Sequence, residues 1–459
     1  MTEQMNEQEL LKLEAQYCSH GDTVHYIDPP KIFEKCEGSW LYDTAQRPYL
    51  DMQMWYSAVN FGYRNSEIEA MHSEQLSRLP QLASQYLHKE KILLAAEIAG
   101  ETEKRFGAKG RVHFNVGGAQ AIEDSMKLVR NYRGGKSLMF AFMGGYHGRT
   151  LGCSEITSSY RYRRRYGHFG SRAAFIPYPY CYRCFYGLKR ENCEDECVRQ
   201  FEKLFETEYY GVFDLKAGEA EFAAFYVEPM QATGGYIAPP PGYFQKLDKI
   251  LKRYNILLVD DEIQMGFYRT GKLWALEHFD VKPDVIAFAK SLTNGLNPLS
   301  GLWAKEEMIN PTVFPPGSTH STFASNPLGT AAGLATMRYI KKHDFGTIVK
   351  EKGAYLLKRL KDLKERHSVI GDVDGLGLAL RIEMTKSDGF TPDKLLTDRI
   401  VDEGMKGDIE VNGKKYGLVL DVGGYHKNAF TLAPALTISY EEMDLFVELF
   451  EASLKRCGV

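Results

Sequence analysis

The sequence predicts an α/β fold, with a mostly parallel central sheet in a large domain and a smaller α+β domain at the C-terminus. Between about residues 90 and 335, short apolar runs alternate with amphipathic stretches, as in strands joined by crossover helices. Beyond residue 335 the chain changes to charged helical segments and short strands. We expect residues 76–335 to form the large domain and 336–459 the small one. Residues 1–75 should contribute to the small domain and to the entrance of the functional site.

Length and composition exclude several classes of protein. With 459 residues, of which 44% are hydrophobic and 25% charged, the chain is neither a small disulfide scaffold nor a disordered protein. Its formal net charge of -3 gives no field for binding polyanions, so nucleic acid is not expected as a main partner. No apolar run approaches the ~20 residues of a membrane-spanning helix, and the N-terminus resembles no targeting signal. We therefore expect a cytoplasmic protein without a membrane partner.

The central sheet is predicted from short segments that are apolar on both faces, as buried parallel strands are. These segments are residues 111–115, 137–142, 222–228, 256–260 and 285–289. Between the first two, apolar residues recur at helical spacing, and glycine pairs at 117–118 and 134–135 bracket them. This pattern predicts a helix over residues 119–132, with its N-terminus beside a glycine pair.

The C-terminal part alternates charged helices with short strands. Residues 337–344 and 351–367 are rich in charge and helix formers, and residues 376–384 carry a short apolar pattern. The chain ends in an amphipathic helix that places Leu445, Phe446, Leu449 and Phe450 on one face. This alternation of charged helices and short strands predicts the second, smaller domain.

The densest chemical signal lies where two neighbouring predicted strands end. Asp261 and Gln264 follow one apolar strand, and Lys290 follows the next. In open α/β sheets, ligands bind at this edge. Pyridoxal phosphate (PLP) needs an anion at its ring nitrogen and an amine at its aldehyde, so this pair suits it. Taken singly, a lysine there is more often a solvated strand cap, and an acidic run more often a surface turn.

Motifs along nearly the whole chain resemble the class III PLP-dependent aminotransferases, the group of ornithine and 4-aminobutyrate aminotransferases. They occur in the order of that family: GSWLYDTAQRPYLD, YSAVNFGY, GGAQAIEDSMKLVRNY, GYHGRT, VEPMQATGG, LLVDDEIQMGFYRTGK, FAKSLTNGLNPLSG, STFASNPLGTAAG and FTLAPALTIS. The resemblance implies fold type I of the PLP-dependent transferases, PLP as cofactor, and a homodimer.

The resemblance also implies roles around the cofactor ring. It makes Lys290 the Schiff-base lysine and proton shuttle, and Asp261 the partner of the pyridine nitrogen. Gln264 matches a residue beside the phenolic oxygen of the ring, and Glu228 a carboxylate that lines the site. Tyr146 matches the aromatic side chain that stacks on the ring. A core tyrosine is the alternative for that position.

Gly118 and Ala119 are the candidate phosphate-binding residues. They open the predicted helix 119–132, where unpaired N–H groups and the helix dipole favour a dianion. The family pattern is Ser-Gly-Ser/Thr, so the hydroxyls expected at Gly117 and Ala119 are missing here. Thr322 matches a threonine that reaches the cofactor phosphate of the neighbouring subunit. Without the resemblance, Thr322 is an ordinary loop residue.

Two departures from the family concern the substrate. The arginine that grips the carboxylate of glutamate in many members is Thr431 here, and its glutamate partner is Thr233. Losing both halves of a salt bridge together indicates a changed site, because either charge alone is costly to bury. Tyr56, Trp55, Arg149 and Thr431 are the tentative substrate residues. Arg149 could bind a distal carboxylate bidentately, or serve a structural role.

Four cysteines lie within 17 residues of an otherwise cysteine-poor chain. Cys181, Cys184, Cys193 and Cys197 have the spacing C-x2-C-x8-C-x3-C, and four thiols can hold a structural zinc or an iron–sulfur cluster. Similar segments in relatives of the family suggest unmetallated loops or disulfides as alternatives. Nothing in the expected chemistry requires a metal.

Together these features predict an enzyme that moves an amino group from a primary amine or amino acid to a keto acid or aldehyde. Its substrate recognition should be non-standard because of Thr431 and Thr233. The alternative is a PLP-dependent amino-acid racemase or epimerase of the same family. A non-catalytic scaffold or metal-dependent regulator is a third possibility, disfavoured because Asp261, Gln264 and Lys290 are all present.

Overall fold

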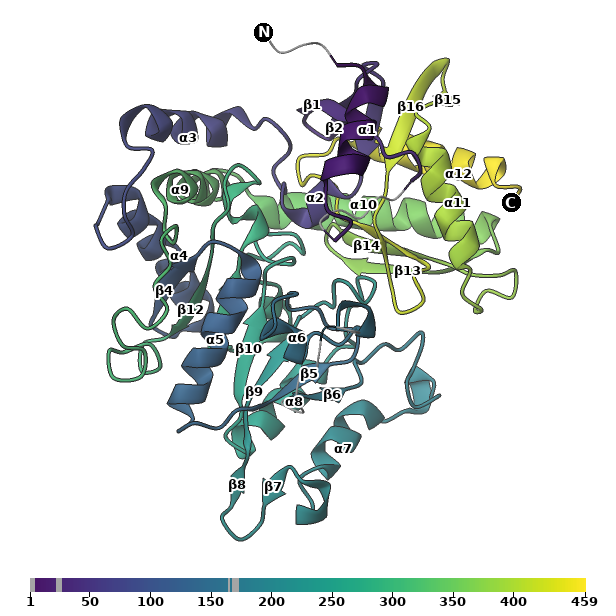
Figure 1. Cartoon of the computed structure of the whole chain (residues 1–459). Coiled ribbons are helices and arrows are strands. Elements are labelled where there is room, and N and C mark those ends of the chain that lie inside the picture. The colour runs from purple at the N-terminus through teal and green to yellow at the C-terminus, as the bar shows by residue number, and fades with distance from the viewer. Residues whose placement is uncertain (1–4, 22–26, 164–165, 167–172) are drawn as a thin grey trace.

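A computed structural model describes residues 5–21, 27–163, 166 and 173–459. A seven-stranded sheet lies at its centre, in the order β4-β12-β11-β10-β9-β5-β6 (Figure 1). The strands are β4 (Gly110–Asn115), β12 (Ser300–Lys305), β11 (Val285–Phe288), β10 (Leu257–Asp261), β9 (Phe222–Val227), β5 (Leu138–Phe142) and β6 (Ala173–Ile176). Only β12 runs antiparallel to its neighbours in this sheet. The predicted α/β class with a mostly parallel sheet is confirmed.

All five predicted strands of this sheet are present, each shifted by no more than a residue or two, and the predicted helix is α5 (Gly118–Tyr132). The prediction missed β6, a four-residue edge strand, and β12. In β12, serine and glycine come first and lysine last, so only a short apolar stretch remains to indicate a buried strand.

Both faces of the sheet are buried, as its apolar strands predicted. Alternate residues of β9 and β10 belong to different clusters: Phe225 and Leu258 pack with α4 (Lys89–Phe106) and α8 (Tyr243–Arg253), whereas Tyr226 and Val259 pack with α5. Because side chains along a strand point alternately to opposite faces, this division shows a helical layer on each side. The layers leave the carboxyl ends of the parallel strands as the accessible edge.

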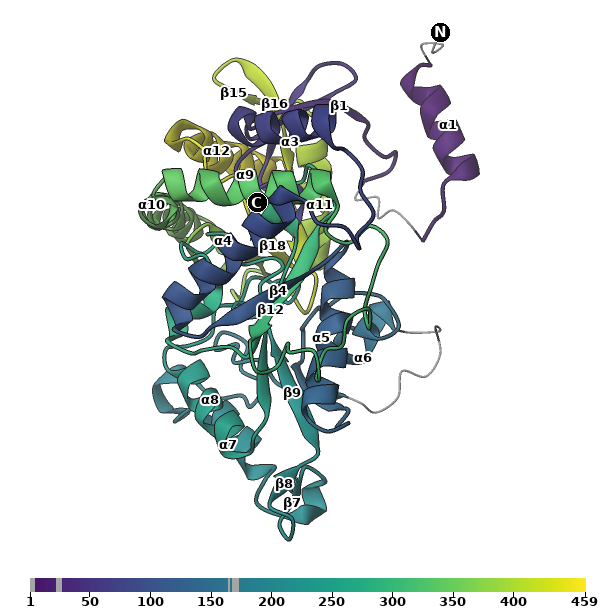
Figure 2. The same ribbon diagram turned by 90° about the vertical axis from the view of Figure 1, so that its left-hand side faces the viewer.

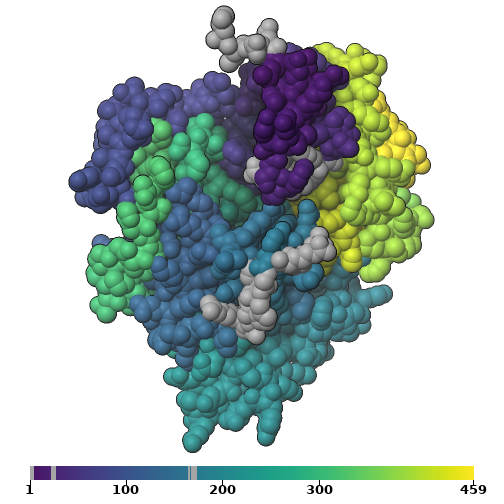
Figure 3. All heavy atoms as spheres, viewed as in Figure 1, coloured from purple at the N-terminus to yellow at the C-terminus, as the bar shows by residue number. Residues whose placement is uncertain are grey.

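N-terminal and C-terminal segments pair in a second sheet, in the order β1 (Phe33–Glu37), β2 (Trp40–Asp43), β3 (Pro48–Asp51), β16 (Lys414–Val419) and β15 (Ile409–Val411). Leu50 of β3 lies opposite Leu418 of β16, and Figure 3 shows the purple and yellow ends of the chain side by side. A third, antiparallel sheet has the order β13 (Ile370–Leu376), β14 (Ala379–Met384), β18 (Ala429–Leu432) and β17 (Val422–Gly423). The division of the chain at residues 75 and 335 remains a prediction.

The remaining elements complete the architecture. The strands of the two smaller sheets are β1 (Phe33–Glu37), β2 (Trp40–Asp43), β3 (Pro48–Asp51), β13 (Ile370–Leu376), β14 (Ala379–Met384), β15 (Ile409–Val411), β16 (Lys414–Val419), β17 (Val422–Gly423) and β18 (Ala429–Leu432), and β7 (Phe213–Asp214) pairs with β8 (Glu219–Ala220). The other helices are α1 (Glu7–Tyr17), α2 (Met54–Ser57), α3 (Ser66–Arg78), α6 (Cys153–Ile156), α7 (Glu196–Lys203), α9 (Pro327–Lys342), α10 (Phe345–Arg366), α11 (Lys394–Met405) and α12 (Tyr440–Arg456).

Helix α1 lies at the edge of the molecule, and none of its residues is buried (Figure 2). The hydroxyl of Thr44 donates a hydrogen bond to the carboxylate of Glu7 in this helix. Asn6 and Glu9 form a capping box that stabilises its first turn. Among the described residues, no helix combines the length and the apolar character that crossing a bilayer requires.

The four clustered cysteines do not support the expected metal centre. Cys181, Cys184, Cys193 and Cys197 line one small cavity of about 30 Å³, and all four thiols are unpaired. Within the described ranges, however, no group of three or more histidine, cysteine or acidic side chains is placed to hold a metal ion. Close spacing along the chain is insufficient because ligands must also converge in space. The zinc or iron–sulfur expectation is corrected accordingly.

Candidate active site

A cavity of about 780 Å³ opens at the carboxyl ends of the central strands. The predicted residues Trp55, Tyr56, Gly118, Ala119, Tyr146, Arg149, Glu228, Asp261, Gln264 and Lys290 all line it. Thr322 and Thr431 do not belong to its lining. The structure thus brings most of the candidate side chains to one place, although they come from segments spread over more than two hundred residues.

Lys290 follows β11 and begins a single 3-10 turn, Lys290–Thr293. Its φ of 44° lies in the left-handed region, which is strained for a residue with a side chain and frequent at functional sites. Its Nζ donates to Oε1 of Gln264 at 3.1 Å, and Nε2 of Gln264 donates to the hydroxyl of Tyr236 at 2.8 Å. Burial lowers the pKa of Lys290, while Asp261 and other acids oppose the shift. Burial therefore favours the neutral, nucleophilic amine.

Asp261 ends β10, and two donors hold its carboxylate. His147 Nδ1 lies 2.7 Å from its Oδ2, and the backbone N–H of Ile263 donates to its Oδ1 at 3.1 Å. Burial acts to lower the pKa of His147, but the hydrogen bond to Asp261 and the negative charges of Asp261 and Glu228 together raise it. Sequence reasoning assigned no role to His147, although it directly follows Tyr146 in the GYHGRT motif.

Glu228 follows β9 and fixes the backbone beside Tyr146. Its carboxylate accepts hydrogen bonds from the N–H groups of Tyr146 and Ala232, each at 2.9 Å. Burial raises the pKa of Glu228 to about 7, with His147 acting in the opposite direction. The carboxylate therefore joins the backbone at Tyr146 to the backbone at Ala232.

The ring of Tyr146 is held from one side by an aromatic and cationic stack. Its centroid lies 5.3 Å from that of Tyr162 in an edge-on arrangement. The guanidinium of Arg149 lies 4.4 Å from the Tyr162 centroid and 5.8 Å from the Tyr146 centroid. These contacts fix the orientation of a ring that lines the cavity.

The N-terminus of α5 provides an anion-binding end to the cavity. Gly117 caps the helix without a side-chain hydrogen bond, and the N–H groups of Gly118 and Ala119 have no acceptor among the described residues. A Cβ on Gly118 would lie 3.1 Å from Cδ1 of Ile263, so glycine allows this close approach. Free N–H groups and the helix dipole together favour a phosphate.

A strained turn forms the other wall. In α2, all four residues Met54–Ser57 have positive φ values, including Trp55 and Tyr56. Asp51 accepts from the N–H of Met54 at 2.9 Å, and at the far end the buried Arg269 donates to Ser57 Oγ at 2.9 Å. Runs of left-handed residues with side chains are costly, so such fixed contacts are needed to hold them.

The side chain of Thr431 and the backbone of Thr233 both lie close to Gly423. A Cβ on Gly423 would be 2.9 Å from Cγ2 of Thr431 and 3.3 Å from the carbonyl oxygen of Thr233. The hydroxyl of Thr431 donates to the carboxylate of Asp421, whose charge also acts on Lys290. A carboxylate therefore lies beside the position at which the family resemblance implies an arginine. Asp421 was missed because it lies outside the family motifs that the sequence matches.

Thr322 lies away from the cavity, in the segment between β12 and α9. Its side chain is exposed, and neighbouring Phe323 is 70% exposed.

The cavity residues fit PLP. A buried lysine, a carboxylate held by a histidine, an aromatic ring and a free helix N-terminus match the aldehyde, ring nitrogen, ring face and phosphate of this cofactor. The family model for aminotransferase class III matches residues 23–454. The chain belongs to the class III aminotransferase family. It is a PLP-dependent enzyme of this family, an aminotransferase.

Several known proteins are similar to this aminotransferase. The leucine/methionine racemase of Thermococcus litoralis is 32% identical, over 98% of this chain and 96% of its own. The alanine/serine racemase of Pyrococcus horikoshii is 31% identical, over 97% and 90%. A Bacillus anthracis aminotransferase of known structure superposes with a TM-score of 0.86 at 27% identity, over 98% and 100%. The proteins similar to this chain thus include both racemases and an aminotransferase.

Proposed function

We propose that this aminotransferase takes its amino group from a primary amine or amino acid and passes it to a keto acid or aldehyde other than 2-oxoglutarate. The observation that carries the proposal is the contact between Thr431 and Asp421. A carboxylate at this place repels a second carboxylate, which the arginine of glutamate-binding members would attract. Thr233, beside it, brings no charge of its own.

We assign each of the cavity residues a separate role in this reaction. Bound PLP supplies the electron sink that makes a C–H bond next to the amino nitrogen acidic. Lys290, whose pKa is lowered by burial, would hold the aldehyde and then move that proton. Asp261, oriented by His147, would keep the ring nitrogen protonated, and the N–H groups of Gly118 and Ala119 would hold the phosphate. Gln264, already bonded to Lys290, would lie beside the phenolic oxygen.

A screen of amino donors and acceptors tests this function. The cofactor-loaded protein is mixed with single amines while its absorbance is followed. The enzyme that has taken up the amino group is then offered pyruvate or 2-oxoglutarate. We expect pyruvate to be preferred, and Asp421→Asn to raise kcat/KM for 2-oxoglutarate about tenfold by removing one repulsive charge. A wild-type preference for 2-oxoglutarate would contradict the proposal.

A second candidate is racemisation of an amino acid on the same residues. It is favoured by the similarity to two racemases. It is also favoured by the absence of the arginine and its glutamate partner that serve glutamate binding in other members, since racemisation needs no second substrate. Incubating the enzyme with one enantiomer in deuterated water, without an acceptor, distinguishes the two. Inversion with uptake of deuterium and no keto acid supports the racemase, whereas stoichiometric keto acid supports the aminotransferase.

We also propose that the enzyme is a homodimer in which Thr322 reaches the cofactor phosphate of the partner. Thr322 is exposed, and so are several large apolar side chains: Phe323 next to it, Leu76 in α3, and Tyr86 and Leu87 in the loop between α3 and α4. An interface would bury them.

Complementation between two inactive variants tests this arrangement. Lys290→Ala lacks the lysine, and Thr322→Asp places a negative charge against the phosphate. If sites are shared, mixed dimers hold one intact site, so co-expression should restore roughly a quarter of the wild-type activity. If each active site is formed by a single chain, co-expression should restore no activity.

A further inference from the structure

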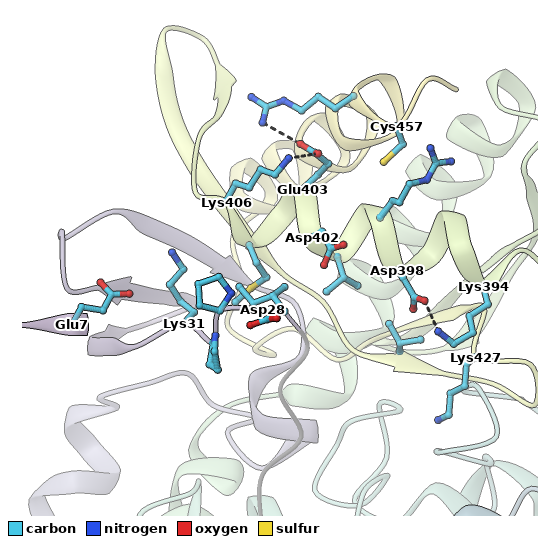
Figure 4. Close-up of a pocket in the computed structure, with 18 of the residues that line it drawn as sticks. Glu7, Asp28, Lys31, Lys394, Asp398, Asp402, Glu403, Lys406, Lys427 and Cys457 are labelled. Atoms are coloured by element: carbon cyan, nitrogen blue, oxygen red, sulfur yellow. Dashed lines mark hydrogen bonds and ion pairs between the residues drawn. The ribbon is translucent and has the colours of Figure 1, made fainter. Parts of the chain in front are cut away.

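A second cavity, of about 1070 Å³, lies between the N-terminal segment and α11 (Figure 4). Within it, Lys394 pairs with Asp398 and Lys406 pairs with Glu403, as the dashed lines in Figure 4 mark. None of the described residues that line it also lines the cavity that contains Lys290. The polar surroundings of Lys290 are therefore set by the wall of its own cavity.

The nitrogen of Lys290 contacts a neutral amide and lies near several acids. Its Nζ donates to Oε1 of Gln264 at 3.1 Å. Burial lowers the pKa of Lys290, while the charges of Asp261, Glu228 and Asp421 act to raise it. These acids come from three places: Asp261 ends β10, Glu228 follows β9, and Asp421 precedes β17. Gln264 is thus the neutral side chain in direct contact with the nitrogen.

The amide of Gln264 is itself fixed by Tyr236. Nε2 of Gln264 donates to the hydroxyl of Tyr236 at 2.8 Å. A glutamine amide has two N–H donors and one oxygen, so Tyr236 takes one donor and Lys290 takes the oxygen. No other contact of this amide is present among the described residues, which leaves its second N–H for the phenolic oxygen of the cofactor. The opposite orientation of the amide would set its N–H groups against those of Lys290.

Tyr236 presents its hydroxyl from a rigid support. The residue is only 1% exposed, and its ring belongs to an apolar cluster with Met230 and Met265. Its φ of 52° lies in the left-handed region, where a residue with a side chain needs fixed contacts. Its N–H donates to the carbonyl of Ala232, and Nη1 of Arg381 donates to its own carbonyl oxygen, each at 3.1 Å. Such support is what precise positioning of a polar group requires.

A buried tyrosine can also serve only to fill the core, and Tyr243 in α8 is such a residue. It too is 1% exposed, and its hydroxyl has no hydrogen-bond partner among the described residues. The hydroxyl of Tyr236, in contrast, is bonded to the amide that contacts Lys290. The hydroxyl, and not the burial of the ring, therefore distinguishes Tyr236.

We propose that Tyr236 is a positioning residue of this aminotransferase, whose hydroxyl holds Gln264 so that Oε1 faces the nitrogen of Lys290 and favours its protonated form. This inference rests on the roles proposed above for Lys290 and Gln264. An acceptor that hydrogen-bonds the charged form of an amine stabilises that form. Without the hydroxyl, a buried N–H of Gln264 loses its partner, so the amide leaves this orientation and the nitrogen of Lys290 loses its acceptor.

The pH dependence of cofactor attachment tests this role. The full chain, freed of PLP, is mixed with PLP between about pH 6 and 10, and the growth of the Schiff-base absorbance is timed. Only the neutral amine attacks the aldehyde, so the midpoint of the rate profile reports the loss of the proton from Lys290. Tyr236→Phe should lower this midpoint by about half a pH unit or more. Tyr243→Phe is the matched control and should keep the wild-type midpoint. An unchanged or raised midpoint in Tyr236→Phe would overturn the inference.

A second variant shows whether Tyr236 acts through Gln264. Gln264→Met removes the amide and should lower the midpoint at least as far as Tyr236→Phe does. The double variant should match Gln264→Met alone, because the hydroxyl then has no amide to hold. Fully additive shifts would mean that Tyr236 acts on Lys290 independently of Gln264, and the positioning role would be wrong.

The absorbance of the loaded protein separates this inference from the proposed function. Lys290→Ala should form no Schiff-base band, and a band in this variant would contradict the role proposed for Lys290 itself. If the band depends on Lys290 but Tyr236→Phe keeps the wild-type midpoint, only the positioning role of Tyr236 fails.

Discussion

Nδ1 of His147 lies 2.7 Å from Oδ2 of Asp261, and both side chains are almost completely buried. The two residues are 114 positions apart in the chain, one after β5 and the other at the end of β10. Since β5 and β10 both flank β9 in a parallel arrangement, their carboxyl ends bring these side chains to the same edge. The imidazole thereby orients the carboxylate expected to face the ring nitrogen of PLP.

Replacing His147 with phenylalanine should weaken cofactor binding and activity by about 10- to 100-fold, because a buried carboxylate loses a charge-assisted donor. His147→Asn provides the control, since its amide nitrogen can occupy the place of Nδ1 and keep the donor. The PLP dissociation constant and kcat/KM of both variants measure the effect. Equal losses in the two variants would show that the ring of His147 matters only for packing.

The sequence predicted those residues whose position follows from the sheet itself. Asp261 and Lys290 follow apolar strands, and strand ends meet at one edge, so their shared cavity could be expected from the pattern alone. Gly118 followed from the same reasoning, because the glycine pair marks the start of α5. These inferences need only local periodicity and general topology.

Contacts between distant segments could not be predicted in this way. The bonds from His147 to Asp261 and from Arg269 to Ser57 join residues 114 and 212 positions apart. Asp421 reaches the site only because Thr431 in β18 lies beside it. The four cysteines show the reverse case: their close spacing predicted a metal site, but among the described residues they are not placed to hold a metal ion.

A hydroxyl at position 117 should tighten cofactor binding. A Cβ on Gly117 would meet no atom within 4 Å, so a serine side chain fits there beside the free N–H groups of α5. Because hydrogen bonds to charged groups contribute roughly 1.5–3 kcal/mol, Gly117→Ser should lower the PLP dissociation constant about tenfold. Gly117→Ala, measured in the same fluorescence titration, should bring no gain. A matching gain in Gly117→Ala would assign the effect to helix stability instead.

Arg269 should be essential for holding the strained turn Met54–Ser57. It is fully buried, and its guanidinium donates to Ser57 Oγ, to Asn60 Oδ1 at 2.7 Å and to the Pro434 carbonyl at 2.6 Å. Burial lowers the pKa of Arg269 to about 10, so the group stays charged at neutral pH. Arg269→Met leaves several buried acceptors unpaired and should lower the free energy of unfolding by about 3 kcal/mol or more.

Urea unfolding of the cofactor-loaded protein measures this loss, and near-ultraviolet circular dichroism reports the environment of Trp55 at the same time. Arg105→Met is the control, because Arg105 also bonds to side chains but lies away from α2, paired with Glu101. A loss no greater than that of Arg105→Met would argue against a special role for Arg269.

Asp260 and Glu262 should make the stability of the protein fall with rising pH. Both are fully buried, and among the described residues both Asp260 oxygens and Oε2 of Glu262 have no hydrogen-bond donor. Burial raises the pKa of Glu262 to about 8 and, together with the neighbouring acid, that of Asp260 well above its usual range. At neutral pH the folded pair therefore retains a proton that the unfolded chain releases near pH 4.

Because the folded state binds more protons than the unfolded state between about pH 4 and 8, the free energy of unfolding should decrease across this window. Asp260→Asn removes one acid and supplies an amide donor to Oε2 of Glu262. The variant should therefore show a flatter pH dependence and exceed wild type in stability at pH 8.5, while differing little at pH 5.5. Urea midpoints at both pH values, with saturating PLP, measure this. Parallel pH profiles for the two proteins would show that the pair does not hold the extra proton.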